Sequence, residues 1–491
     1  MSKNYCSSNG AVNGGSNYVD SFSEIEKAMT NKGLSKAAFH LLDRLTDMFP
    51  SIVPVFFQKV FQTLLGNGVV YSFYLARYRH ILKKAKNFDA ILVVADINIG
   101  DAIMLQQALE VLRHYFPFSR IDYLCNQTGG ELVADLPAVN HVYKVFNGAG
   151  IPTRNDLAMV NNIVKSTRYS VIINYCPFIA NDVLDTKAIV VRMYIPLASH
   201  IIRRWKQQNG QRHISDATHT LLENLLSPIV SSRHIHNSEQ ETHSPAMVKG
   251  NSIYLTYSAI HEAHNFLERY GLLHEKHLLF FNPDATSHYT RMPLSLQIEI
   301  LQNVLTSQLI DAVLLGASYS QELSEQMVVS AIPKSLQKKI VIVPHLSVSV
   351  YAALIDSCNM FLSSDTGPVH IAASWKVSIH KSETLKNNTS VITVFGSGDS
   401  KMYGYDSRLK DHVPANQLAP SKVFVARAPC RNITCVNKWG KSCKEVRCFH
   451  GLEAKEITDY ILSYFRQVRS HEYVRTAETA ASPAVYRRTI N

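Results

Sequence analysis

The chain has 491 residues, of which 46% are hydrophobic and 18% are charged, and this composition excludes an intrinsically disordered protein. Its length is sufficient for two or three domains with hydrophobic cores of their own. Fifty Lys and Arg against 39 Asp and Glu give a formal net charge of +11, which favours anionic partners such as acidic lipid, phosphorylated small molecules or nucleic acid.

The first 20 residues are polar and lack the apolar segment of a cleavable signal peptide, so we expect a cytoplasmic protein. Residues 51–76 are strongly apolar, but interrupting polar residues argue against a membrane-spanning helix. A basic cluster follows: Arg77, Arg79, His80, Lys83, Lys84 and Lys86. This combination suits a helix lying in the interface of an acidic membrane; packing against the first domain is the alternative.

From residue 90 onward, short β-branched runs alternate with amphipathic helices, which predicts parallel sheets covered by helices. Strands are expected at 91–95, 120–125, 142–146, 170–175, 277–283, 312–316, 339–344, 360–364 and 391–396. Helices are expected at 102–115, 156–167, 321–331, 348–358, after Pro368 and at 454–467. Leu105, Leu109, Leu112 and Phe116 define one buried face of the first helix.

Between about residues 198 and 250 the composition becomes polar and rich in His, which we interpret as the join between two α/β domains. The predicted organisation is a helical extension (1–85), a first domain (86–245), a second domain (246–450) and a last helix with a loosely ordered tail (451–491).

Ligands of open parallel sheets bind at the carboxyl ends of strands, where loops lead into helices. The first such junction is DINIGDAIML, whose single Gly100 is not a dinucleotide-binding fingerprint. Asp101 stands where a helix N-cap is expected. An exposed carboxylate above a strand end also suits a general base, so the position leaves both roles open.

The second junction is FFNPDATSHYTRMP, which places Thr286, Ser287, Thr290 and Arg291 in a short loop. Hydroxyls and a guanidinium suit phosphate oxygens, although a loop of this composition is also ordinary.

The third junction is SSDTGPVHIAASW. Pro368 suits the first turn of a helix, and Gly367 lets the backbone approach a ligand closely. The N–H groups that follow Thr366 would form an anion site, with Asp365 accepting a hydrogen bond from a sugar hydroxyl and His370 donating to a phosphate. The alternative is a capped helix start with a half-buried His.

Four cysteines cluster late in the chain beside His450: Cys430, Cys435, Cys443 and Cys448. They would hold a structural zinc ion, stay reduced or pair locally; the spacing differs from that of usual zinc sites. No acidic pair resembles a metal-diphosphate clamp, so we expect no catalytic metal.

Together the junctions resemble glycosyltransferase family 9, typified by bacterial ADP-heptose:lipopolysaccharide heptosyltransferases. The similarity extends from about residue 90 to about residue 462 and rests on GDAIMLQQALEVLRHYFPFSRIDYL, NPDATS with TRMP, SSDTGPVHIAAS and VITVFGSGD. It implies a GT-B fold, in which an acceptor-side and a donor-side Rossmann-like domain face each other across a cleft and the last helix crosses back to the first domain. Members invert the anomeric centre without a metal, and the nucleotide-sugar is a substrate, so no cofactor is expected.

By this resemblance Asp101 matches the catalytic base. The donor-binding set that it implies, together with the loop residues above, is Asp365, Thr366, Gly367, Pro368, His370, Thr286, Ser287 and Arg291. Thr290 stands where the family usually has a phosphate-binding Lys, and the stretch after Ala373 is longer than the usual turn.

The predicted function is that of an inverting glycosyltransferase that moves a sugar, heptose from ADP-heptose, to a lipopolysaccharide-core or related surface-glycan acceptor. The protein would act as a peripheral protein on the inner face of the cytoplasmic membrane. Alternatives are a GT-B sugar-nucleotide epimerase and a catalytically silent GT-B scaffold that binds a glycan or a protein at the membrane. No basic stripe interleaved with aromatic residues supports nucleic-acid binding.

Overall fold

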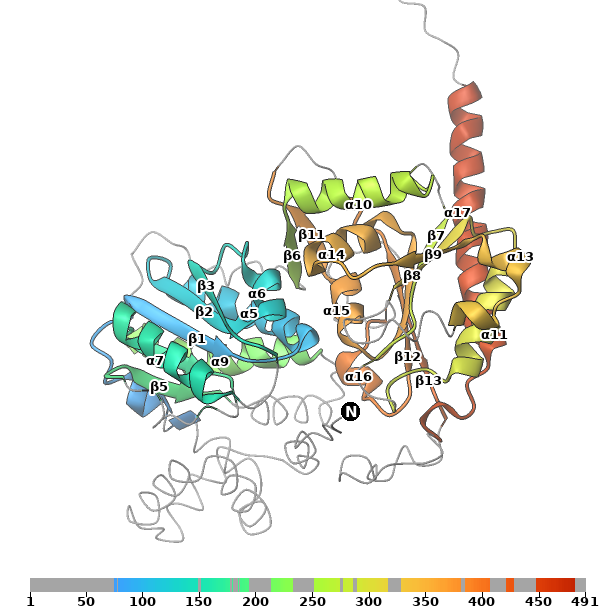
Figure 1. Cartoon of the computed structure of the whole chain (residues 1–491). Helices are drawn as coiled ribbons and strands as arrows, with labels where there is room; N and C mark the ends of the chain where they lie inside the picture. Colours follow the sequence, from blue (N-terminus) through green and yellow to red (C-terminus); the bar gives the residue numbers. More distant parts are fainter. Residues whose placement is uncertain are drawn as a thin grey trace, which may run out of the picture.

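The computed structural model describes residues 75–76, 78–148, 152–176, 179, 184, 186–193, 213–232, 251–273, 277–285, 289–316, 328–380, 385–406, 421–427 and 447–481. Two large parallel sheets, each flanked by helices, form the two halves of this part of the chain (Figure 1). Strand and helix alternate along the chain, as the sequence pattern predicts. The predicted α/β fold with two parallel-sheet domains is therefore confirmed.

The first sheet has the strand order β3-β2-β1-β4-β5. Its strands are β1 (Ala90–Ala95), β2 (Arg120–Asn126), β3 (His141–Phe146), β4 (Val171–Asn174) and β5 (Ile189–Arg192). Its connecting helices are α5 (Ile99–Tyr115), α6 (Gln127–Val133) and α7 (Arg154–Thr167). The predicted face of α5, which comprises Leu105, Leu109, Leu112 and Phe116, is buried. β1 pairs with β2 on one side and β4 on the other, so α5 starts above the middle of the sheet.

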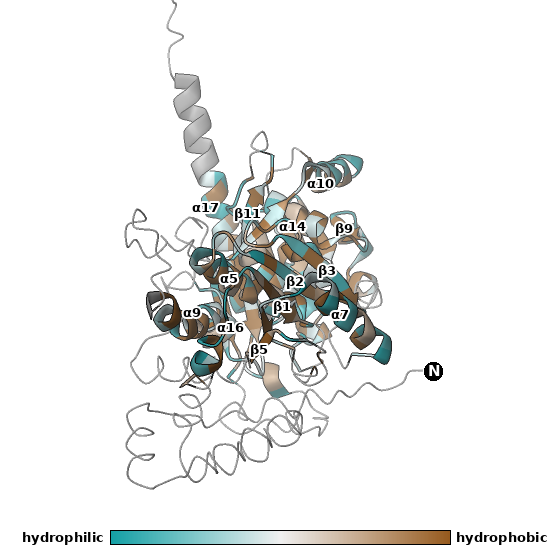
Figure 2. Cartoon of the chain, turned by 90° about the vertical axis from the view of Figure 1, so that its left-hand side faces the viewer, coloured by the Kyte–Doolittle hydropathy of each residue, from teal (hydrophilic) through white to brown (hydrophobic). Residues whose placement is uncertain are grey.

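The predicted polar join between the domains is wrong for one segment. Helix α9 (Ile214–Ser232) lies within it and packs along α5. Leu221, Leu222, Leu225 and Ile229 are buried there, and Figure 2 shows the apolar character of this helix. The polar, His-rich residues on both sides of α9 dominated the composition and hid its apolar spacing.

The second sheet has the strand order β13-β12-β10-β7-β8-β9. Its strands are β7 (Leu278–Asn282), β8 (Ala312–Gly316), β9 (Ile340–Val343), β10 (Met360–Ser364), β12 (Ser390–Phe395) and β13 (Lys422–Val425). The helices of this half are α11 (Leu294–Thr306), α13 (Lys334–Gln337), α14 (Val348–Ser357), α15 (Gly367–Ala373), α16 (Ser400–Tyr403), the short 3-10 helix η4 (Arg447–Phe449) and α17 (Ala454–Ala481). β10 lies between β7 and β12, so Asp365 follows a central strand.

Strands β6 (Ser252–Leu255) and β11 (Trp375–Ser378) pair in parallel to form a small third sheet, which the sequence did not predict. Helix α10 (Tyr257–Arg269) follows β6. Strands of four residues carry too little periodicity to be recognised from sequence alone.

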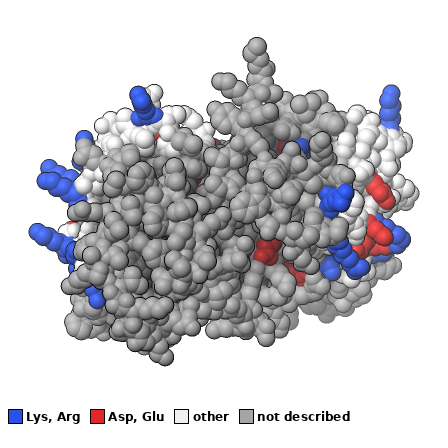
Figure 3. Space-filling view, turned by 90° about the horizontal axis from the view of Figure 1, so that it is seen from below, with Lys and Arg blue, Asp and Glu red and all other residues white. Residues whose placement is uncertain are grey.

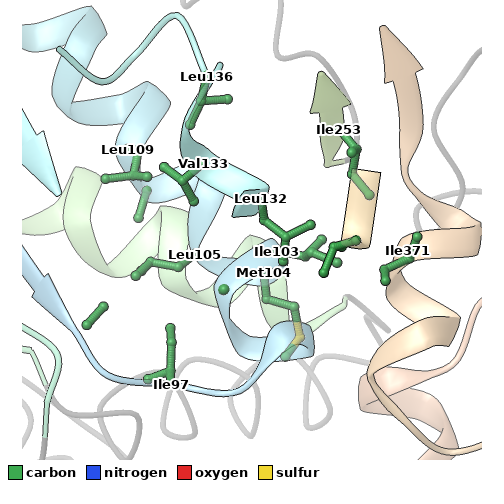
Figure 4. Close-up of a cluster of buried hydrophobic side chains, with 14 of the residues drawn as sticks. Ile97, Ile103, Met104, Leu105, Leu109, Leu132, Val133, Leu136, Ile253 and Ile371 are labelled. Atoms are coloured by element: carbon green, nitrogen blue, oxygen red, sulfur yellow. The ribbon is translucent and has the colours of Figure 1, made fainter. Parts of the chain in front are cut away.

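The two halves are packed against each other at α5 and α15. Figure 4 shows Ile103, Met104 and Leu132 of the first half beside Ile253 and Ile371 of the second, and these residues belong to one hydrophobic core. The predicted domains therefore share buried apolar surface next to the candidate site.

The predicted crossing of the last helix to the first domain is wrong for the described residues. α17 packs on α11, on the side of the second sheet remote from the first half (Figure 1). Ile457, Ile461 and Phe465 occur at every fourth position and are completely buried in the core of the second half, which occupies the apolar face of the helix. The helix also extends to Ala481, beyond the expected end at residue 467 and into the expected tail.

No helix among the described residues is both long and apolar enough to span a membrane. The predicted domain boundaries at 85, 245 and 450 stay predictions, as does most of the expected helix at 321–331, whose first seven residues lie outside the described residues.

Candidate functional site

Asp101 lies in the first turn of α5, at its third residue. The N-cap is Asn98, so the predicted N-cap role of Asp101 is wrong. Asp101 is half-buried, and no group of the described residues hydrogen-bonds its carboxyl. Burial raises the pKa of this carboxyl from 3.8 to about 6. A partly desolvated carboxyl with such a pKa, and with no hydrogen-bond partner among the described residues, is suited to accept a proton near neutral pH.

Asp365 follows β10 directly and is also half-buried. Burial, with a smaller contribution from the charge of Asp399, raises the pKa of its carboxyl to about 7. A Cβ placed on Gly398 would overlap Asp365 Oδ2, so the glycine lets the loop after β12 approach this carboxyl.

The carboxyls of Asp101 and Asp365 belong to different halves of the molecule, but the charges of both raise the pKa of one side chain, Tyr403. The pKa of Tyr403, at the end of α16, is raised by burial and then by the charges of Asp101, Asp365 and Asp399. Strand-to-helix junctions identified Asp101 and Asp365, whereas Tyr403 and Asp399 were missed. Asp399 ends the VITVFGSGD segment of the resemblance and Tyr403 follows that segment, but no residue-level signal there points to either side chain.

Glycines allow the starts of α5 and α15 to touch. A Cβ on Gly367 would stand 3.3 Å from the Cβ of Ile99 and 3.5 Å from the backbone nitrogen of Gly100. Thr366 is the N-cap of α15, without a side-chain capping bond, and Pro368 lies in the first turn as predicted. The structure therefore brings the predicted donor-site segment within contact distance of the residue that precedes Asp101.

His370 is buried at this contact, with 5% of its surface exposed. Its Nδ1 lies 2.8 Å from the hydroxyl of Tyr405. Burial lowers the pKa of His370 from 6.5 to about 4, so the imidazole is neutral at pH 7. It is thus a neutral donor or acceptor, and its predicted bond to a phosphate remains a prediction.

Of the three donor-site residues predicted in the loop after β7, the structure describes one, Arg291. Thr286 and Ser287 lie outside the described residues. Arg291 forms an ion pair with Asp284, with Nη2 2.6 Å from Oδ1, and also donates to the carbonyl of Ala285. Burial raises the pKa of Asp284, and Arg291 opposes that rise. Part of the Arg291 guanidinium is therefore committed to its own loop.

The cysteine cluster cannot be assembled from the described residues, because Cys430, Cys435 and Cys443 lie outside them. Cys448 is buried in the core of the second half, next to Phe449. Within the described ranges, no group of three or more His, Cys, Asp or Glu side chains is arranged to hold a metal ion.

The fold and the site define a GT-B protein with a carboxyl from each half at their contact. Residues 213–427 match the family model of glycosyltransferase family 9 (heptosyltransferase), which confirms the predicted resemblance. This range includes Asp365 and His370, whereas Asp101 lies before it.

Solved structures share the fold. The glycosyl transferase family 9 protein from Veillonella parvula DSM 2008 is 15% identical with a TM-score of 0.55, over 78% of this chain and 98% of that chain. The ADP-heptose lps heptosyltransferase II of E. coli is 12% identical with a TM-score of 0.51, over 77% of this chain and 99% of that chain. No curated protein matches the chain.

Proposed function

We propose that the protein is an inverting, metal-independent glycosyltransferase that transfers heptose from ADP-heptose to a lipopolysaccharide-core or related surface-glycan acceptor. The observation that carries the proposal is the meeting of Asp101, from the first half, with the Asp365 segment of the second half at the α5–α15 contact. The family match, and the name of the E. coli structure of similar fold, support heptose and ADP as parts of the donor.

Asp101 is the proposed general base. It takes the proton of the acceptor hydroxyl while that oxygen attacks the anomeric carbon of the donor sugar. The bond between this carbon and the diphosphate oxygen breaks, and ADP leaves with the bonding electron pair. Attack opposite the leaving group inverts the anomeric centre. A pKa of about 6 leaves Asp101 ionised at pH 7.5 while keeping it more basic than an exposed aspartate.

Asp365 is the proposed acceptor of a hydrogen bond from a hydroxyl of the donor. The backbone N–H groups after Thr366 and the side chain of His370 then face the diphosphate, where negative charge develops as the bond breaks. Thr286, Ser287 and Arg291 are further proposed contacts of the phosphates, and Pro368 fixes the backbone of this segment.

Peripheral contact with an acidic membrane is part of the proposal. His80, Lys83, Lys84 and Lys86 are exposed, whereas Arg79 donates to the carbonyl of Asn224 on α9. Figure 3 shows Lys and Arg side chains along the outer edge of the N-terminal half. The preceding apolar residues, 51–74, lie outside the described residues.

A catalytically silent scaffold is the second candidate. Thr290 stands where the family usually has a phosphate-binding Lys, and Arg291 is paired with Asp284 instead of being free to replace it. Such a scaffold would bind a glycan or protein without turning over a nucleotide-sugar.

A thermal-shift panel of ADP, UDP, GDP, CMP and ADP-heptose tests the donor site, with wild type, Asp365→Ala and the surface control Asp459→Ala. At about 100 times its dissociation constant a ligand adds roughly 2.7 kcal/mol of stability. We expect ADP and ADP-heptose alone to stabilise wild type and the control, and to lose this effect in Asp365→Ala. Stabilisation by another nucleotide would contradict the donor assignment, and stabilisation by none would favour the scaffold.

A further inference from the structure

A chain of polar side chains leads from the first half to His370. His213, just before α9, has Nδ1 2.7 Å from Ser215 Oγ, and Asn251 Nδ2 donates to the same oxygen at 3.3 Å. All of these side chains are buried. The rings of His213 and Tyr405 lie 4.8 Å apart between centroids, and Tyr405 in turn contacts His370. This row of polar side chains therefore connects the starts of α9 and β6 to α15.

The donor and acceptor strengths of the two groups give the direction of the hydrogen bond between Tyr405 and His370. Burial raises the pKa of Tyr405, so its hydroxyl keeps its proton at pH 7. The imidazole of His370 is neutral, and a neutral imidazole nitrogen accepts from a phenol more readily than a phenol oxygen accepts from an imidazole N–H. With Nδ1 2.8 Å from the hydroxyl, Tyr405 therefore donates to Nδ1 of His370.

The other nitrogen of His370 faces the start of α5. A Cβ on Gly100 would stand 3.3 Å from Nε2, and no group of the described residues hydrogen-bonds this nitrogen. A neutral imidazole that accepts at Nδ1 carries its proton on Nε2. The hydrogen bond at Nδ1 thus fixes the tautomer of His370, and the resulting N–H at Nε2 points toward the start of α5.

We infer that Tyr405 is a positioning residue that holds His370 as the Nε2–H tautomer, with this N–H presented beside Gly100 to a phosphate oxygen of the donor. The phosphate part of this inference rests on the proposed function, whereas the tautomer does not. Without Tyr405 the ring would be free to carry its proton on Nδ1, and Nε2 would then repel a phosphate oxygen instead of donating to it.

Histidine-selective ¹⁵N labelling tests the tautomer directly, because two-bond ¹H–¹⁵N correlations distinguish the two neutral forms. His370→Gln identifies the His370 signal among the 21 histidines. We expect the Nε2–H form in wild type and its partial or complete loss in Tyr405→Phe. An Nδ1–H form in wild type would overturn the inference, and this measurement does not require Tyr405→Phe to fold.

Donor kinetics test the consequence. We expect Tyr405→Phe to lower kcat/KM for ADP-heptose roughly tenfold, as for loss of one hydrogen bond to a charged group. Tyr464→Phe is the matched control, because this tyrosine also loses one hydrogen bond, to the carbonyl of Asn359, in the other core. Unchanged kinetics and an unchanged tautomer in Tyr405→Phe would overturn the inference. If wild type fails to turn over donor, the proposed function fails, and the spectrum still decides the tautomer.

Discussion

The imidazole of His370 lies against Gly100 across the contact between the two halves: a Cβ at Gly100 would stand 2.7 Å from His370 Cδ2. Real Cβ atoms essentially never approach another heavy atom this closely. The two helix starts are therefore close enough to carry one site only because residue 100 lacks a side chain.

Gly100→Ala is expected to displace the His370 ring and to lower kcat/KM for the donor by about tenfold or more, because small displacements of a catalytic group cost large factors in rate. Steady-state kinetics with ADP-heptose measure the effect. Gly129→Ala on α6 is the control, since its nearest contact would be 3.3 Å from Asn126 Oδ1 and the others 3.7 Å or more. Equal kinetics in wild type and Gly100→Ala would show that the His370 ring has no role in turnover.

The pH profile of kcat/KM is expected to fall on the acid side with an apparent pKa between about 6 and 7. Asp101 must be ionised to accept a proton, and the pKa values of Asp101 and Asp365 are raised to about 6 and about 7. Because Asp399 contributes to the rise at Asp365, Asp399→Asn should move the acid limb to lower pH. A limb near pH 4 in wild type would contradict the burial of both carboxyls.

Asp101→Asn should be more stable than wild type at pH 7.5. The pKa of Asp101 is about 6 in the folded protein and 3.8 as the reference value, so below pH 3.8 both states are protonated and the charge costs nothing. Above pH 6 the folded protein must hold a half-buried charge, which costs on the order of 1 to 2 kcal/mol after allowance for exposure. Thermal unfolding at pH 7.5 and pH 4 measures the difference, which should shrink at pH 4. A stability gain independent of pH would have another cause.

Arg291→Met separates a structural from a ligand-binding role of Arg291. Removing the guanidinium leaves the completely buried Asp284 unpaired, which typically costs about 3 kcal/mol or more. Urea unfolding should show this loss, and the double variant Asp284→Asn with Arg291→Met should recover most of it. If Arg291→Met instead loses ADP binding at unchanged stability, the main role of Arg291 is to bind phosphate.

Much of the fold could be predicted because buried strands appear as short apolar runs and longer helices show apolar residues at helical spacing. β1 and β10 appear as short apolar runs, and each leads into a junction that holds a candidate residue, Asp101 after β1 and Asp365 after β10. α9 was missed because polar neighbours masked its apolar spacing. The position of α17 depends on which hydrophobic core buries Ile457 and its apolar neighbours. The helical spacing of these residues predicts a helix with an apolar face, but it does not say against which domain that face packs.

The site was predictable in part. Asp101 and Asp365 lie at strand-to-helix junctions, where parallel sheets place ligands, so position marked them as candidates, and the family resemblance gave each its role. Tyr403, Tyr405 and His213 are distant from them in sequence and reach the site only through the packing of the two halves. No local pattern announces a contact of that kind.

Sugar transfer by wild type and Asp101→Asn, measured beside ADP-heptose binding, tests the central claim most directly. The assay follows ADP release with a heptose-deficient lipopolysaccharide core as acceptor. We predict that Asp101→Asn loses a factor of about 10² to 10⁴ in kcat, the usual contribution of a general base, while donor binding stays within a few-fold of wild type. Undiminished transfer by Asp101→Asn, or loss of donor binding together with transfer, would contradict the assignment of Asp101 as the base.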